Sequence, residues 1–154
     1  MARAADPADI RAWRRRSDAV TTSGRLEERD LERLAAIGVR HVINLALDDH
    51  PEALPGEADR LGALGIAYTH IPVPFGAPTR AHYAAFRAAL TEVDGPVHVH
   101  CIMNYRVTAF FYLLDLESGM EEPVARERMA EVWNPFAAQD PAARPWADLL
   151  QRPA

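Results

Sequence analysis

The chain of 154 residues has no lysine, only one cysteine and no long apolar run. Its 17 basic residues are all arginines and stand against 22 Asp and Glu residues, which gives a net charge of −5. This acidic balance argues against nucleic acid and against an anionic membrane surface as partners. A single cysteine cannot form an internal disulfide and is typical of a reducing compartment, so we expect a cytoplasmic location. No apolar run approaches the roughly 20 residues that a membrane-spanning helix needs.

Length and composition are those of an ordinary globular domain. Hydrophobic residues make up 49% of the chain and charged residues 25%, which argues against disorder. We therefore expect one domain over residues 1–154. Residues 1–18 contain arginines without a hydrophobic stretch behind them, so they do not resemble a secretory signal. They are expected to form a peripheral, solvated segment.

The hydrophobic pattern alternates between the periods of strands and helices. Strands are expected at 20–22, 39–45, 66–73 and 97–100. Helices are expected at 27–37, 57–64, 79–93, 106–119, 122–132 and 145–150. Strands that alternate with helices predict an α/β domain, with a mostly parallel central sheet flanked by helices.

The segment PVHVHCIMNYRVTAFF is the most informative part of the chain. Cys101 follows directly on a predicted strand, four residues pass, and Arg106 opens a predicted helix. Backbone amides that converge near a helix N-terminus favour an anion, and the same field favours thiolate over thiol. Arg106 can donate two parallel hydrogen bonds to an oxyanion held over the sulfur. The plainer alternative makes Cys101 a small buried hydrophobe and Arg106 a surface charge. The order of strand, cysteine, loop, arginine and helix instead favours a nucleophile with an anion site.

The four loop residues are expected to line this anion site: Ile102, Met103, Asn104 and Tyr105. The loop has no glycine, and Asn104 is the residue that best tolerates the positive φ that a tight amide cradle needs. Two roles are open for the Tyr105 ring, which either stacks on a substrate ring or fills space beside the sheet.

At these residues the sequence resembles the cysteine-dependent tyrosine and dual-specificity phosphatases, above all their small bacterial members. The family signature is His-Cys, a five-residue loop, Arg and a hydroxyl residue. The likeness extends to TTSGRLEERDLERLAAIGVRHVINL and HIPVPFGAPT and covers about residues 20–119. It implies a phosphate-binding loop between a strand and a helix, and hydrolysis of a phosphorylated substrate through a phosphocysteine. Cys101 would be the nucleophile, Arg106 would bind the phosphoryl group, and His100 would help to orient the loop.

Two departures from the signature leave alternatives open. Only four residues separate Cys101 from Arg106, one fewer than usual, and this is the loop size of rhodanese-type sulfurtransferases. The hydroxyl is displaced to Thr108, which either stabilises the thiolate or caps the helix. A sulfurtransferase, and an oxyanion-binding module without efficient turnover, are therefore the alternatives to a phosphatase.

The general acid that the resemblance implies is missing from its expected place. No Asp or Glu occurs between Asp59 and Glu92, where His70 and His82 are the residues able to titrate near neutral pH. A loop after a predicted strand carries three weaker candidates, Asp48, Asp49 and His50. No metal site is expected, since His98 and His100 share a strand face without further ligands at suitable spacing. No cofactor is implied.

Overall fold

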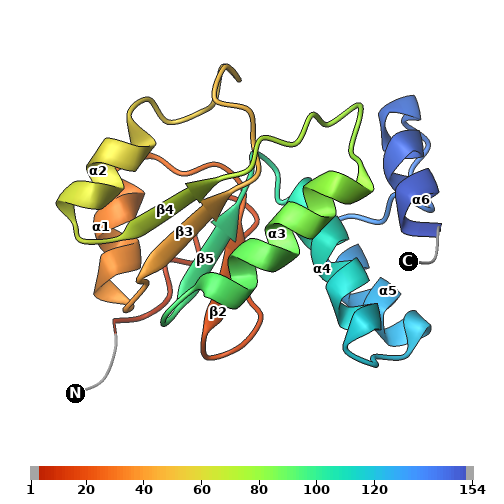
Figure 1. Cartoon of the computed structure of the whole chain (residues 1–154), viewed down its shortest axis with the longest axis horizontal. Coiled ribbons are helices and arrows are strands. Elements are labelled where there is room, and N and C mark those ends of the chain that lie inside the picture. Colours follow the sequence, from red (N-terminus) through yellow and green to blue (C-terminus); the bar gives the residue numbers. More distant parts are fainter. Residues whose placement is uncertain (1–3, 152–154) are drawn as a thin grey trace.

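The structure, a computed structural model, describes residues 4–151 and centres on a twisted sheet (Figure 1). The strands lie in the order β1-β2-β5-β3-β4. Their bounds are Arg14–Arg15 for β1, Val20–Ser23 for β2, His41–Asn44 for β3, Ala67–His70 for β4 and Val97–His100 for β5. β2, β5, β3 and β4 pair in parallel, and β1 adds an antiparallel edge to β2. The predicted α/β fold with a mostly parallel sheet is confirmed, and the short β1 is the strand that the sequence did not predict.

Helices cover both faces of this sheet (Figure 1). They are α1 (Glu28–Ala36), α2 (Glu57–Ala63), α3 (Arg80–Glu92), α4 (Tyr105–Glu117), α5 (Glu122–Ala130) and α6 (Arg144–Gln151). α1 and α2 pack on one face, while α3 and α4 pack on the other, with α5 and α6 beyond α4. Among the described residues, no helix has the length and apolar character needed to cross a membrane.

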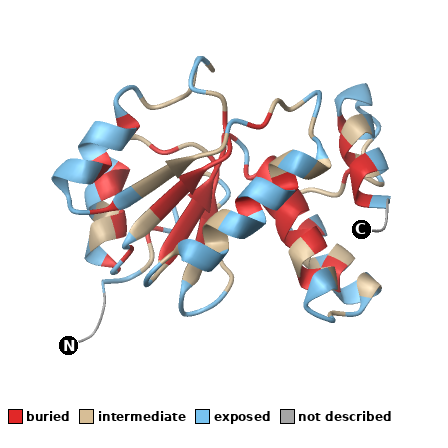
Figure 2. Ribbon diagram, in the orientation of Figure 1, coloured by how far each residue is buried: buried red, intermediate tan, exposed pale blue. Residues whose placement is uncertain are grey.

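Two hydrophobic cores form because neighbouring residues of a strand point to opposite faces. In β3, Val42 packs among the apolar residues of α1 and α2, while Ile43 belongs to the core on the other face. The second core is built around α4, which is buried along most of its length (Figure 2). This helix carries the fully buried Phe110. A helix buried on most sides between a sheet and other helices is a rigid support for whatever its first turn holds.

Residues 4–18 are an integral part of the fold, although the sequence predicted a peripheral segment over residues 1–18, of which residues 1–3 lie outside the described residues. Ile10 is buried in the core under α1. Arg14 and Arg15 form β1, and Arg16 makes a largely buried ion pair with Asp115 of α4 at 2.7 Å. Burial lowers the pKa of Arg16, and the hydrogen bond that Arg16 donates to Asp115 opposes this effect. Residues 14–16 therefore tie this segment to the sheet edge and to α4 instead of lying solvated.

His98 links β2 to β5 inside the sheet. It is fully buried, with Nδ1 2.8 Å from the Thr21 hydroxyl and Nε2 2.8 Å from the Ser23 hydroxyl. The Ser23 hydroxyl donates its hydrogen to the Gly24 carbonyl, so Nε2 must be the protonated nitrogen and Nδ1 accepts from Thr21. Burial, together with nearby His100, holds the pKa of His98 well below its ordinary value. The ring is therefore neutral in the native state.

Gly24 lies where β2 leaves the sheet and meets the loop after β5. A Cβ at this position would lie 2.4 Å from the carbonyl oxygen of Ile102 and 3.1 Å from the Arg11 side chain. Its amide also donates to the Arg11 carbonyl at 2.7 Å. The backbone of the two segments can approach this closely only because residue 24 has no side chain.

We expect Gly24→Ala to lower the free energy of unfolding by about 1–3 kcal/mol, because the added methyl forces the Ile102 carbonyl away. Urea unfolding followed by circular dichroism measures this loss. Gly62→Ala is the matched control, since a Cβ there meets nothing within 4 Å and lies in a helix. The control should be neutral or stabilising by about 0.5–1 kcal/mol. Equal stability of the two variants would contradict the packing argument.

We also expect the free energy of unfolding to decrease as the pH is lowered, because of His98. The unfolded chain takes up a proton at this residue below about pH 6.5, whereas the native state, with its lowered pKa, does not. The His98 contribution is therefore complete above about pH 6.5 and decreases, by up to about 1.4 kcal/mol per pH unit, as the pH falls from there.

Urea unfolding between pH 7.5 and pH 5 should therefore show a smaller pH dependence in His98→Gln than in the parent. Thr21→Val serves as the control, because it removes one hydrogen bond and leaves the histidine in place. This control should be less stable at every pH while it retains the parent slope. If His98→Gln kept the same dependence of unfolding free energy on pH as the parent, His98 would not be the source of that dependence.

Candidate functional site

Cys101 lies at the carboxyl end of β5, the strand between β2 and β3. It is 1% exposed, and its amide donates to the Ser23 carbonyl at 3.4 Å. Parallel strands end at the same edge of a sheet, so the loops after β2 and β3 also reach this edge. The thiol is thus held at the base of a site whose walls come from several loops.

The backbone after Cys101 offers a set of unused donors. Within the described part of the chain, the amides of Ile102, Met103 and Asn104 have no hydrogen-bond acceptor. The amides of Tyr105 and Arg106 open α4, where the first bond back into the helix comes from Thr108 to the Asn104 carbonyl. A run of amides without acceptors and the positive end of a 13-residue helix therefore follow directly on the thiol, an arrangement that favours an anion there.

Asn104 gives the loop its turn, as the sequence predicted. Its φ of 69° and ψ of 4° place it in the left-handed region directly before α4. The side chain is buried, and Nδ2 donates to the Ala12 carbonyl at 2.9 Å and to the Thr22 hydroxyl at 3.1 Å. The N-terminal segment and β2 thus fix the one loop residue with unusual backbone geometry.

Arg106 is a buried cation that forms no ion pair with any described residue. It is 6% exposed, Nη1 donates to the Val73 carbonyl at 2.9 Å, and Nε has no partner. Its guanidinium carbon lies 5.8 Å from the centre of the Phe75 ring. A buried charge without a counter-charge is costly, so this arrangement indicates a site built for an anionic ligand.

His100 connects the loop to a buried carboxylate that the sequence analysis missed. Nε2 of His100 lies 2.6 Å from Oε2 of Glu57, and Nδ1 lies 3.1 Å from the Cys101 carbonyl. A carbonyl can only accept, so Nδ1 carries a hydrogen, and one further proton is shared between Nε2 and Glu57. Glu57 begins α2 after the Pro55-Gly56 turn, and no sequence spacing relates it to Cys101. The pair holds His100 and, through it, the first peptide of the loop.

The remaining predicted residues take different positions. Ile102 is buried and its carbonyl accepts from the Arg25 amide, whereas Met103 is 41% exposed at the rim. Tyr105 stacks on Trp133, with ring centres 4.6 Å apart and planes 12° from parallel, so one face of its ring packs within the protein. Thr108 lines a cavity of about 60 Å³ beside β1, and its hydroxyl makes no hydrogen bond with the Cys101 sulfur in the described structure.

Among the described residues, no hydrogen bond or ion pair joins a candidate proton donor to the loop after Cys101. His82 caps α3 by accepting from the Thr79 amide, and His70 contacts the Ala46 carbonyl at 2.6 Å. Asp48 and Asp49 are exposed, and Nδ1 of His50 accepts from the Glu52 amide. Each histidine among them is thus engaged in supporting a loop or a helix end.

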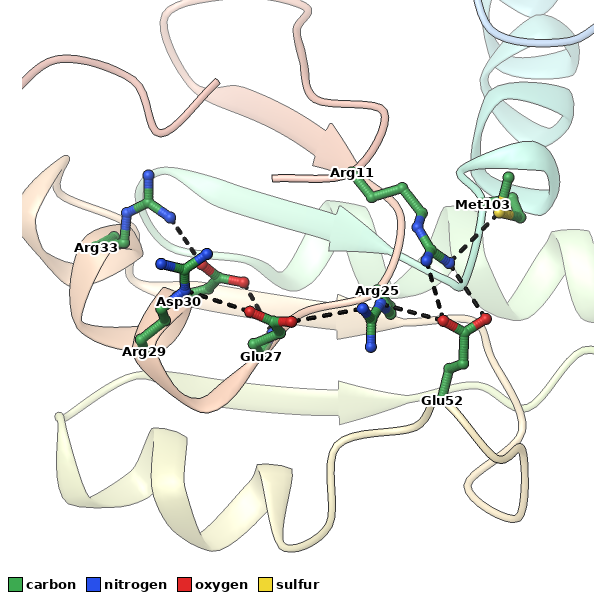
Figure 3. Close-up of polar contacts among 8 residues, drawn as sticks. All are labelled: Arg11, Arg25, Glu27, Arg29, Asp30, Arg33, Glu52 and Met103. Atoms are coloured by element: carbon green, nitrogen blue, oxygen red, sulfur yellow. Dashed lines mark hydrogen bonds and ion pairs between the residues drawn. The ribbon is translucent and has the colours of Figure 1, made fainter. Parts of the chain in front are cut away.

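Glu52 is a second carboxylate near the site that the sequence analysis missed. The loop between β3 and α2 places it against the rim, where it contacts Arg11 and Arg25 (Figure 3). The hydrogen bond from Arg11, helped by the charge of Arg25, lowers the pKa of Glu52 below its ordinary value. Because it remains ionised at neutral pH, it cannot replace the missing acid.

The rings of His98 and His100 are occupied by protein partners on both nitrogens. No group of three or more potential metal ligands occurs among residues 4–151. The chemistry suggested by the geometry is therefore that of a thiol beside an anion cradle.

The structure is similar to known phosphatase folds. It matches a DUF442 protein from Shewanella putrefaciens CN-32 with a TM-score of 0.79 and 32% identity, over 94% of this chain and 92% of that one. It also matches TpbA from P. aeruginosa, crystallised in complex with phosphotyrosine, with a TM-score of 0.67 and 19% identity, over 96% and 86% of the two chains. The second likeness shows a shared fold.

The sequence is similar to a larger bacterial protein. A beta-lactamase hydrolase-like protein of Agrobacterium fabrum is 31% identical over 106 residues, which are 67% of this chain and 25% of that protein. The chain thus spans about a quarter of the length of its curated relatives. Residues 12–114 match the family model of the phosphatase-like domain of these proteins. The chain therefore belongs to the family of the beta-lactamase hydrolase-like protein, phosphatase-like domain, and has a tyrosine and dual-specificity phosphatase-like fold.

Proposed function

We propose that this chain hydrolyses phosphate monoesters through a phosphocysteine on Cys101, without a metal. The observation that carries the proposal is the buried Arg106, which has no carboxylate partner among the described residues and lies in the first turn of α4, directly after a loop with three unused amides. Such a cradle suits the three non-bridging oxygens of a phosphate. The family and its fold support the same class of reaction.

In the first step the Cys101 thiolate attacks phosphorus. The S–P bond forms while the ester P–O bond breaks, and the electron pair of that bond leaves with the ester oxygen. The loop amides and the guanidinium of Arg106 bind the non-bridging oxygens, where they stabilise the charge of the transition state. Both sets of donors are fixed before the substrate arrives, which is the condition for effective electrostatic stabilisation.

In the second step water attacks the phosphocysteine. The new P–O bond forms as the S–P bond breaks, releasing inorganic phosphate and restoring the thiolate. The first turn of α4 stabilises a negative sulfur, so the thiolate is a good leaving group. The His100–Glu57 pair keeps the first peptide of the loop in place through both steps.

Aromatic residues beside the guanidinium favour an aryl phosphate as substrate. Phe75 lies next to Arg106, and its ring centre is 6.4 Å from that of Tyr105 and 5.6 Å from that of Trp133. A phenyl group above the phosphate would meet apolar rings on this side. The complex of TpbA with phosphotyrosine agrees with an aryl substrate for this fold.

The four-residue loop supports a second candidate, transfer of sulfur through a persulfide on Cys101. The same amides and Arg106 would then bind a smaller sulfur oxyanion. An assay with thiosulfate and cyanide, run beside one with p-nitrophenyl phosphate, separates the two reactions. Phosphate release without thiocyanate formation is the result that the proposal expects.

The roles of the two signature residues can be separated by mutation. Cys101→Ser should abolish turnover of p-nitrophenyl phosphate and still bind phosphate or vanadate, because the amides and Arg106 remain. Arg106→Lys keeps the charge but loses the planar pair of donors, so binding and kcat should both decrease.

Steady-state kinetics and calorimetric titration measure the two effects. The control Arg87→Lys lies on the exposed side of α3 and should behave as the parent. Appreciable turnover by Cys101→Ser would refute the covalent mechanism.

The absence of an acid on the loop between β4 and α3 predicts a strong dependence on the leaving group. General acid catalysis is typically worth about 10²–10⁴ in rate, so alkyl phosphates should hardly react while aryl phosphates of acidic phenols turn over. The measurement is kcat/KM for a series of aryl phosphates plotted against phenol pKa.

The series is repeated with Asp48→Asn, Asp49→Asn, His70→Ala and His82→Ala. We expect the steep dependence to be unchanged in all four. A shallow dependence in the parent that becomes steep in one variant would overturn the prediction and identify the donor.

A further inference from the structure

Two arginines at the rim of the site, Arg11 and Arg25, together hold a carboxylate of the chain itself (Figure 3). The guanidinium of Arg11 donates to both oxygens of Glu52, at 3.3 and 3.0 Å. Nε of Arg25 lies 3.2 Å from one of these oxygens. We call these two residues the arginine pair. The geometry is that of a carboxylate-binding site with an internal ligand.

The arginine pair is attached to the Cys101 loop through the backbone. The Arg25 amide donates to the Ile102 carbonyl at 2.9 Å, and the Gly24 amide donates to the Arg11 carbonyl at 2.7 Å. The Arg11 side chain also reaches the sulfur of Met103 at 3.5 Å. The fold therefore fixes the pair beside the loop that would bind the scissile phosphate.

A hollow of about 150 Å³ opens beside the arginine pair. Three carboxylates also line it, those of Asp9, Glu27 and Asp30. Each is already matched by an arginine: Glu27 by Arg25 at 3.5 Å and by Arg29 at 3.3 Å, and Asp9 and Asp30 by Arg33. Glu52 differs because it comes from the loop between β3 and α2 and is 38% exposed. An ion pair this exposed to water is weak, so an anion from solution can replace Glu52.

We propose that the arginine pair is a second anion subsite, which selects phosphate monoesters that carry a further carboxylate or phosphate group near the scissile phosphate. Glu52 is the internal competitor that occupies this subsite when it holds no substrate. The inference rests on the proposed function, because it takes the scissile phosphate to lie over Cys101. It adds a substrate class that the anion cradle alone does not determine.

The test compares substrates that differ in one charge. The first pair is two phosphotyrosine peptides, with Asp or Asn next to the phosphotyrosine. The second is 3-carboxyphenyl phosphate and 3-carbamoylphenyl phosphate. For each pair the ratio of kcat/KM, anionic over neutral, is measured at low salt. A preference in the peptide pair indicates an acidic side chain as the second group, and a preference in the aryl pair indicates a small molecule; either supports the subsite.

The expected ratios follow from the competition by Glu52. The parent should prefer the anionic substrate about 2-fold, and Glu52→Gln should raise this preference to about 5-fold, which is the upper range for an exposed ion pair. Arg11→Gln and Arg25→Gln should bring the ratio to about 1. Raising the ionic strength should lower the preference of Glu52→Gln, because exposed charges are screened.

Arg29→Gln is the matched control. Arg29 belongs to the same network but contacts Glu27 and not Glu52, so its loss should leave the ratio at the parent value (Figure 3). A change in this variant as large as that in Arg25→Gln would mean a general effect of surface charge, and would overturn the subsite.

Failure of this inference and failure of the proposed function give different results. If p-nitrophenyl phosphate is hydrolysed but both ratios stay near 1 in the parent and in Glu52→Gln, the subsite is overturned and the function stands. If no phosphate ester is hydrolysed, the proposed function fails. The same peptide and aryl pairs are then titrated against Cys101→Ser and against the double variant Cys101→Ser, Glu52→Gln. Equal affinities for the anionic and the neutral member of each pair, in both variants, would again overturn the subsite.

Discussion

The buried guanidinium of Arg106 is the constraint around which the site is built. A cation that is 6% exposed and has no carboxylate partner in the described structure must be stabilised by other means. The Val73 carbonyl accepts one of its hydrogen bonds and the ring of Phe75 lies beside it. The Phe75 carbonyl in turn accepts from Nε1 of Trp146 in α6 at 2.7 Å. The C-terminal helix thus fixes the loop that positions Arg106, and the charge is left to attract an anion.

The fold and the shape of the loop after Cys101 could largely be predicted from the sequence, because they depend on local signals. Hydrophobic periodicity indicated the strands from β2 to β5 and the helices, and the left-handed Asn104 was predicted from the lack of glycine in its loop. The contributions of Gly24 and Glu57 could not be predicted. Each acts through a contact with a segment far away in sequence, and nothing in the local pattern marks that contact. The N-terminal arginines were misread for the same reason, since Arg16 finds its partner in α4.

Long-range contacts of this kind explain how a loop without glycine keeps its shape. Asn104 can adopt a positive φ at moderate cost, but a single turn of backbone does not fix four residues. The structure adds a support on each side of the turn. The Ala12 carbonyl and the Thr22 hydroxyl bind the Asn104 side chain, while the Glu57–His100 pair holds the peptide of Cys101. The amides between these supports are therefore organised before an anion binds, which is what electrostatic catalysis requires.

Buried and exposed arginines in this site are suited to different tasks. Arg106 is inside the protein, where the dielectric is low and an ion interacts strongly, so in the proposed reaction it suits the charge that develops on the phosphate. Arg11 and Arg25 are about one third exposed, at 33% and 35%, and water weakens their interactions. Weak contacts add little to the rate of chemistry, but they can discriminate between substrates that bind equally well over Cys101. The positions of the carboxylates follow from this division. Glu52 lies against the exposed arginines, where it can be displaced. No carboxylate of the described residues lies against Arg106, where it would block the proposed reaction.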